Sequence, residues 1–203
     1  MSKKLFIFDL DGVLVEACDW HRDALNEALL EVSDCAITQQ EHIKIFNGIP
    51  TRKKLSILLK ENRIKDEDVE RIYKLKQKYT IKTIKKEASI RDEKIEMLNF
   101  LKERGHTVAC YTNSIRETAE LMLKKTGIYD LFDYVLTNQD VKESKPSPEG
   151  YIFLIRHYNI NKEMCYIIED SPKGIAAASN SGANVIRVKN ADDVNIDTIR
   201  SFV

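Results

Sequence analysis

The chain has 203 residues, of which 43% are hydrophobic and 32% are charged, and its formal net charge is zero. This composition is typical of a globular protein with a substantial core, and the balanced charge predicts no nucleic-acid partner and no attraction to a membrane surface. No apolar run approaches the roughly 20 residues that a membrane-spanning helix needs.

The cysteines give no sign of a zinc site. The chain has four, Cys18, Cys35, Cys110 and Cys165, which lie far apart and form no CxxC pair. Such cysteines fit a reducing compartment, and the apolar run near the N-terminus is too short for a signal peptide. We therefore expect a cytoplasmic protein, and a monomer, since no long apolar seam is evident.

The first predicted element is a buried parallel strand, Leu5–Phe8, made of four consecutive apolar residues. Two acids spaced by one residue, Asp9 and Asp11, follow where this strand must end. Gly12 comes directly after them and permits a turn. Two carboxylates at the end of a buried strand are unfavourable unless a cation or a proton is bound there. The segment is therefore a candidate site.

About 90 residues without a convincing strand come next. Their patterns predict helices over residues 19–32, 38–46, 51–60, 66–86 and 91–104. Thr38 with Glu41 has the spacing of a capping box. The last helix leads directly into the next strand, so we assign it to the sheet-containing part. The predicted domains are a core, residues 1–15 and 89–203, and a helical insertion, residues 16–88.

The rest of the chain alternates between short apolar runs and helical patterns. Strands are predicted at residues 107–111, 134–136, 165–168 and 184–188. Ser114 with Glu117 predicts a capping box at the start of the helix after the first of these runs. Further helices are predicted over residues 148–158 and 172–181. This alternation predicts an α/β fold, with a parallel sheet flanked by helices on both faces.

Polar side chains recur where these strands end. Thr112 and Asn113 follow the second strand, Lys145 lies in a polar loop after the third, and Glu169 and Asp170 follow the fourth. In an open α/β sheet, ligands bind beyond the carboxyl ends of the strands. We therefore expect these segments to converge on Asp9 and Asp11.

The converging residue types suit phosphoryl transfer. Asp9, Glu169 and Asp170 offer hard oxygen ligands of the kind that Mg²⁺ prefers. Thr112 offers a hydroxyl beside a predicted helix N-terminus, which favours anions. Lys145 supplies a positive charge for phosphate oxygens.

The chain resembles the haloacid dehalogenase superfamily in four ordered motifs: FDLDGVL, YTNS, KPSP and YIIEDSPKGIAAA. The resemblance implies a Rossmann-like parallel-sheet core with an all-helical cap domain inserted after the first motif. The predicted helical insertion is similar to such a cap. Among the family, the chain looks most like the phosphoglycolate phosphatases and β-phosphoglucomutases.

The resemblance implies that the two acids of the first motif have different roles. Asp9 is expected to be the nucleophile, which attacks phosphorus and forms an aspartyl-phosphate, and also a metal ligand. Asp11 is expected to be the general acid and base, and its backbone carbonyl also to bind Mg²⁺. Dehalogenases of the family lack an acid at the second position, so the resemblance favours phosphoryl transfer over dehalogenation.

The other three motifs are expected to hold the phosphoryl group and the metal ion. Thr112, Asn113 and Lys145 correspond to the phosphate-binding positions. Asp170 corresponds to the main metal ligand besides Asp9, and Glu169 supports the metal directly or through water.

Three residues of the predicted cap are candidates for substrate specificity. His21 lies where caps of this group often have a histidine near the site, although a partly buried structural histidine explains it equally well. Arg52 and Lys53 follow a stretch that resembles the family's cap loop and could contact an anionic substrate. A capped helix start explains the neighbouring Thr51 equally well.

The preferred hypothesis is a Mg²⁺-dependent phosphatase that acts on a small phosphorylated metabolite. A sugar phosphate, phosphoglycolate and a nucleoside monophosphate all remain open as its substrate. Caps of the predicted size usually accompany small substrates rather than proteins.

Two alternatives remain. A phosphomutase of the β-phosphoglucomutase kind would share these motifs, but here Ala17 replaces the cap-entry threonine, and Thr51 stands where an arginine is expected, with Arg52 one place later. A non-enzymatic phospho-aspartate switch, like a receiver domain, uses a similar set of residues but lacks a cap. Phosphate release without a bisphosphate activator, and the lifetime of the aspartyl-phosphate, discriminate between these hypotheses.

Overall fold

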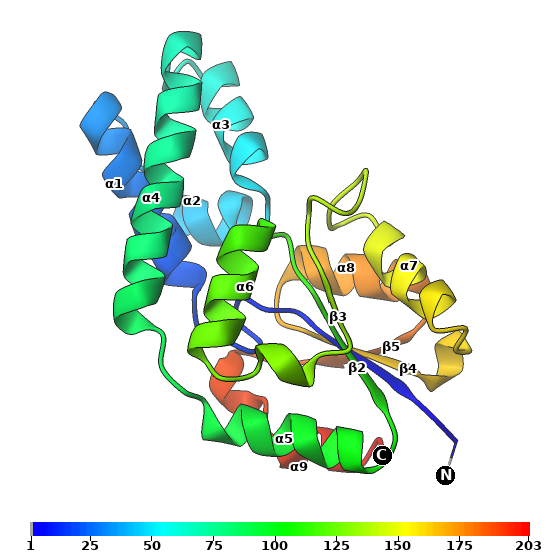
Figure 1. The fold of residues 1–203 in the computed structure, drawn as a ribbon. Coiled ribbons are helices and arrows are strands. Elements are labelled where there is room, and N and C mark those ends of the chain that lie inside the picture. The colour runs from blue at the N-terminus through cyan, green and yellow to red at the C-terminus, as the bar shows by residue number, and fades with distance from the viewer. Residues whose placement is uncertain (1) are drawn as a thin grey trace. The chain divides into compact units, whose positions relative to one another are not determined.

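The computed structural model describes residues 2–203, and within them five parallel strands form one sheet in the order β3-β2-β1-β4-β5 (Figure 1). The strands are β1 (Leu5–Phe8), β2 (Thr107–Tyr111), β3 (Tyr134–Leu136), β4 (Cys165–Glu169) and β5 (Asn184–Arg187). The predicted α/β fold with an inserted helical segment is confirmed.

The first strand lies at the centre of the sheet, and all four of its residues have no exposed surface. Its last residue, Phe8, is level with Cys110 of β2 and Ile168 of β4. The residues that follow these three positions therefore emerge at the same edge of the sheet. This register explains why motifs far apart in the sequence meet beyond the carboxyl ends of the strands.

Helices cover both faces of the sheet. On one face, α7 (Glu149–His157) and α8 (Pro172–Ser181) bury Tyr151, Leu154, Ala177 and Ala178 against the strands. On the other face, α5 (Asp92–Glu103) lies beside the short α9 (Ile196–Arg200). The remaining helix of this unit, α6 (Arg116–Lys125), follows β2.

One predicted helix start is wrong and another is confirmed. Ser114 does not cap a helix: α6 begins at Arg116, and its N-cap residue, Ile115, makes no side-chain capping bond. The Ser114 hydroxyl instead donates to Asp11. Thr38 and Glu41 do form the predicted capping box, with both of its reciprocal bonds.

Residues 17–88 form a second compact unit, and the residues described within it contain helices but no strand. Its elements are α1 (Cys18–Val32), α2 (Gln39–Glu41) continuing into a π-helix (His42–Phe46), α3 (Thr51–Lys60) and α4 (Val69–Glu87). It has its own apolar core, which includes Leu25, Leu29, Phe46, Leu55 and Ile72. The predicted division into two domains remains a proposal, and these unit bounds support it.

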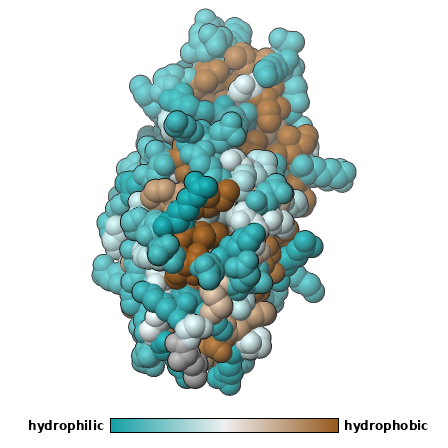
Figure 2. Space-filling view, turned by 90° about the vertical axis from the view of Figure 1, so that its right-hand side faces the viewer, coloured by the Kyte–Doolittle hydropathy of each residue, from teal (hydrophilic) through white to brown (hydrophobic). Residues whose placement is uncertain are grey.

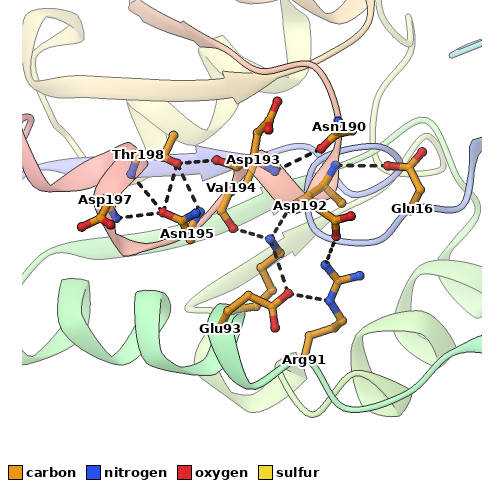
Figure 3. Close-up of polar contacts among 12 residues, drawn as sticks. Glu16, Arg91, Glu93, Asn190, Asp192, Asp193, Val194, Asn195, Asp197 and Thr198 are labelled. Carbon is orange, nitrogen blue, oxygen red and sulfur yellow. Dashed lines mark hydrogen bonds and ion pairs between the residues drawn. The ribbon is translucent and has the colours of Figure 1, made fainter.

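Polar contacts link the C-terminal segment to α5 and to the residue before it, Arg91 (Figure 3). Lys94 of α5 has no exposed surface, and its ammonium donates to the backbone carbonyls of Ala191 and Val194. Glu16 accepts a hydrogen bond from the Ala191 N–H at 3.1 Å, and Arg91 pairs with Asp192 at 2.8 Å. Because Glu16 precedes the insertion and Arg91 follows it, one turn of the C-terminal segment holds the chain on both sides of the insertion.

Large exposed hydrophobic side chains are scattered among the described residues. The most exposed are Leu30, Ile43, Ile45, Ile90 and Phe153. Ile43 and Ile45 share the π-helix His42–Phe46, and the other three lie in separate parts of the chain. On the face shown in Figure 2, hydrophobic residues lie between hydrophilic ones. Single exposed residues of this kind are normal on a protein surface. Within residues 2–203, every helix is too short or too polar to cross a lipid bilayer.

Candidate active site

The turn after β1 brings Asp9 and Asp11 to the edge of the sheet. Gly12 adopts a φ of 92°, in the left-handed region that favours glycine. A side-chain carbon added there would lie 2.3 Å from the Asp170 carboxylate. Only glycine therefore allows this turn to approach the loop that follows β4.

Three carboxylates meet in this region. One oxygen from each of Asp9, Glu169 and Asp170 lies within 4.8 Å of the other two. Glu169 has no exposed surface and Asp9 is 7% exposed. The predicted ligands from the first and fourth motifs are therefore close together in the structure.

The carboxylates of this cluster disfavour one another's charge. Burial raises the Asp9 pKa well above 3.8; Lys145 opposes this rise, while Glu169, Asp170 and Asp11 add to it. Burial and the Glu169 charge raise the pKa of Asp170 to about 7. Asp170 also has a buried oxygen, Oδ1, with no hydrogen-bond partner among the described residues. An all-oxygen cluster with excess negative charge and an unsatisfied buried oxygen fits a divalent cation.

Lys145 contacts two of these three carboxylates and is 3% exposed. Its Nζ donates to Asp9 Oδ1 at 2.5 Å, to Glu169 Oε1 at 2.5 Å and to the Tyr111 carbonyl at 2.8 Å. Burial alone would lower the Lys145 pKa, but the Asp9 and Glu169 carboxylates outweigh it and raise the pKa well above 10.5. An ammonium has three N–H donors, so these contacts use all of them.

Asn113 holds the backbone of Lys145. Its side-chain amide donates to the Lys145 carbonyl at 3.2 Å, and its Oδ1 accepts from the Lys145 N–H at 3.1 Å. Asn138 in turn donates to the Asn113 carbonyl at 2.8 Å. The structure therefore brings the predicted phosphate-binding Asn113 and Lys145 together, and their contact with phosphate stays a prediction.

Asp11 points toward the residues that follow β2. Its Oδ2 accepts hydrogen bonds from the Ser114 hydroxyl at 2.9 Å and from the Thr112 hydroxyl at 3.4 Å. Thr112 is 1% exposed, and its hydroxyl also accepts from the Ser114 N–H at 2.9 Å. Two hydroxyls that follow β2 therefore hold the Asp11 carboxylate, which lies beside the predicted phosphate-binding Thr112.

Sequence reasoning missed two residues of the site. Its spacing to Glu117 predicts a helix cap at Ser114, but Ser114 is also the next polar residue after Thr112 and Asn113, and this position is the signal that groups it with them. Tyr151 lies on α7 and donates its hydroxyl to Glu169 Oε1 at 2.6 Å. No local pattern marks Tyr151, because an aromatic residue on a buried helix face normally indicates core packing.

The three candidates for substrate specificity lie in the helical unit. His21 Nδ1 is 3.0 Å from the ammonium of Lys76. Arg52 pairs with Glu70 at 3.1 Å and lies over the Tyr73 ring, 4.1 Å from its centroid. Lys53 is exposed in the first turn of α3. Their contact with a substrate stays a prediction.

Comparison with known proteins supports the same interpretation. The model of the haloacid dehalogenase-like hydrolase family matches residues 6–188. A phosphorylated carbohydrates phosphatase of Thermotoga maritima is 28% identical over 178 residues, which cover 87% of this chain and 80% of the relative.

Solved structures share the fold over nearly the whole chain. A β-phosphoglucomutase from Clostridium difficile superposes with a TM-score of 0.84 at 23% identity, covering 99% of this chain and 97% of that one. A variant of CbbY from Rhodobacter sphaeroides, in complex with xylulose-(1,5)bisphosphate, superposes with a TM-score of 0.83 at 21% identity, covering 92% of this chain and 86% of that one.

Proposed function

Since this chain belongs to the haloacid dehalogenase-like hydrolase family and is a phosphatase of that family, we propose that it hydrolyses a small phosphorylated sugar with the help of Mg²⁺. The observation that carries this proposal is the position of Asp9. Its carboxylate contacts one cation, Lys145, and lies close to two further carboxylates, with which it can hold another cation.

We assign the nucleophile to Asp9. Lys145 holds its Oδ1, so Oδ2 is the oxygen that attacks phosphorus. A phosphorus–oxygen bond to Asp9 forms while the bond to the sugar oxygen breaks, which gives an aspartyl-phosphate and splits one difficult hydrolysis into two easier steps. Mg²⁺ held by Asp9, Asp170, Glu169 and the Asp11 carbonyl would neutralise phosphate charge that otherwise repels the nucleophile.

Asp11 is the proposed acid and base of both steps. In the first step its carboxyl group gives a proton to the leaving sugar oxygen. In the second its carboxylate takes a proton from the water that attacks phosphorus, and the bond between phosphorus and Asp9 breaks. The hydroxyls of Ser114 and Thr112 orient the Asp11 carboxylate for this exchange.

The substrate class rests on the relatives. The Thermotoga maritima relative is named for phosphorylated carbohydrates, and CbbY binds a sugar bisphosphate. We therefore place sugar phosphates first, ahead of phosphoglycolate and nucleoside monophosphates. The four free cysteines support a reducing cytoplasm as the place of action.

A screen for phosphate release tests the proposal. The purified protein, with Mg²⁺ but no sugar bisphosphate, is given sugar phosphates, phosphoglycolate and nucleoside monophosphates in turn. We expect free phosphate from at least one sugar phosphate and none with the Asp9→Asn variant. An isomerised sugar phosphate without phosphate release would instead indicate a mutase. A long-lived phosphoprotein without turnover would indicate a switch.

A further inference from the structure

Glu169 differs from the other two carboxylates of the cluster in how its oxygens are used. Its Oε1 accepts two short hydrogen bonds, from Lys145 at 2.5 Å and from Tyr151 at 2.6 Å. Among the described residues, its Oε2 receives only a long contact, 3.4 Å, from the Ser171 hydroxyl. An oxygen that already has two donors is a poor ligand for a cation, which leaves Oε2 as the available ligand atom.

The hydroxyl of Tyr151 is held rigidly in place. The side chain has no exposed surface, and its ring packs edge-on against Tyr111, with centroids 4.9 Å apart and planes at 85°. A side-chain carbon on the preceding residue, Gly150, would lie 2.3 Å from the Tyr111 ring, so this glycine allows α7 to approach β2 closely. The ammonium of Lys145 lies 5.2 Å from the Tyr151 ring centroid.

From these contacts we infer that Tyr151 is a positioning residue for the cation site, which acts through Glu169. Its hydroxyl occupies Oε1 and fixes the rotation of the Glu169 carboxylate, so that Oε2 remains the ligand atom available to the cation. Hydrogen bonds behind a metal ligand typically change metal affinity by about 10–100-fold. This inference rests on the proposed function only in that it requires the cluster to bind a divalent cation.

Tyr111 provides a matched control. Its hydroxyl is also buried, but it has no hydrogen-bond partner among residues 2–203. Tyr111→Phe and Tyr151→Phe therefore remove the same atom from two rings that touch each other, and only the second removes a hydrogen bond to Glu169. A buried hydroxyl without a partner contributes nothing favourable, so Tyr111→Phe should be neutral or stabilising.

The test measures binding of Mn²⁺, an oxygen-preferring substitute for Mg²⁺, to the protein without substrate. Free Mn²⁺ is counted by electron paramagnetic resonance, and Mg²⁺ is then added to displace the bound ion. We expect Tyr151→Phe to weaken Mn²⁺ binding at least about tenfold and Tyr111→Phe to leave it unchanged. Thermal melts of the metal-free variants show that each is folded.

The outcomes separate this inference from the proposed function. Wild-type affinity in Tyr151→Phe, even with a lower melting temperature, would reduce Tyr151 to a packing residue and overturn the inference. Equal weakening in both variants would overturn it as well. A third outcome is weaker Mn²⁺ binding by Tyr151→Phe than by the wild type, together with no phosphate release by the wild type from any substrate. It would support the inference and overturn the proposed function.

Discussion

Lys145 is the one cation that the described structure places in direct contact with the buried carboxylates of the site. Its ammonium contacts both Asp9 and Glu169, and neither of these carboxylates is appreciably exposed to water. Removing one partner of a buried charge pair leaves the other without compensation, which is strongly destabilising. The residue thus combines two roles, because it stabilises the folded site and opposes the rise that burial causes in the pKa of the proposed nucleophile, Asp9.

Replacing this lysine should affect both stability and activity. We expect Lys145→Met to lower the free energy of unfolding of the metal-free protein by about 3–5 kcal/mol and to abolish phosphate release. Urea unfolding and the phosphate assay measure the two effects. Lys142→Met, at an exposed position in the same loop, is the control and should change neither. An active, fully stable Lys145→Met protein would refute the assigned role.

Removing the proposed Mg²⁺ should abolish activity and lower the stability of the fold. Excess EDTA is expected to stop phosphate release, because Asp9, Glu169 and Asp170 then repel both one another and the substrate phosphate. Restoring Mg²⁺ to 100 times its Kd should stabilise the fold by about 2.7 kcal/mol, which thermal melts measure. The Asp170→Asn variant should show a much smaller shift. Full activity in EDTA would contradict the metal assignment.

At the scale of elements, the π-helix His42–Phe46 introduces a buried histidine into the helical unit. His42 is 2% exposed, and neither ring nitrogen has a partner among the described residues. Burial lowers its pKa to about 4, and the charges of Lys54 and Arg22 contribute in the same direction. The folded protein therefore keeps His42 neutral at pH values where the unfolded chain protonates it.

This shift predicts acid sensitivity. Between the ordinary pKa of about 6.5 and about 4, the unfolded chain binds a proton at His42 that the folded protein does not. The contribution of neutral His42 to the free energy of unfolding is therefore fully present above pH 6.5. It is lost as the pH falls toward 4, and the loss is about 3 kcal/mol at most. Urea unfolding at pH 7 and pH 4.5 should show a smaller loss for His42→Leu than for wild type. Equal losses would disprove this source of acid sensitivity.

The contact between α5 and the C-terminal segment allows a paired comparison. Lys94→Met removes two donors and leaves the Ala191 and Val194 carbonyls buried without them. We expect a loss of about 2–4 kcal/mol in the free energy of unfolding. Arg91→Ala removes ion pairs to Glu93 and to the exposed Asp192 and should cause a loss of only about 1 kcal/mol. Chemical denaturation of both variants tests this ranking, which a larger effect of Arg91→Ala would reverse.

The elements show which parts of the site could be predicted. The residues at the strand ends can be predicted from the sequence, because apolar runs mark the strands and a parallel sheet places their carboxyl ends at one edge. Asp9, Thr112, Lys145 and Glu169 follow from that rule. The role of Ser114 does not follow from it. A serine before a helix can cap that helix or form a hydrogen bond elsewhere, and here its bond to Asp11, which is remote in sequence, determines its role. The role of Tyr151 cannot be predicted from the local sequence either, because it depends on a contact with Glu169, 18 positions away.

On the scale of the whole molecule, the site is assembled by contacts that are remote in sequence. The Lys145–Asp9 contact spans 136 positions, and the Ser114–Asp11 contact spans 103. No single motif can therefore create the site before the central strands pair. The two segments that border the helical unit, near Glu16 and Arg91, are fixed to the same C-terminal turn. The sheet-containing unit thus holds both ends of the insertion.

We propose that Asp9 accepts the phosphoryl group and that Asp11 drives its removal. The most direct test mixes the Asp11→Asn variant with a phosphorylated sugar and quenches the reaction with acid. Mass spectrometry of the variant's peptides then shows which residue carries the phosphoryl group. We expect the peptide that contains Asp9 to gain the mass of one phosphoryl group. In the double variant that carries both Asp11→Asn and Asp9→Asn, this peptide should gain no such mass. A phosphoryl group on another residue, or turnover of Asp11→Asn at the wild-type rate, would contradict the account.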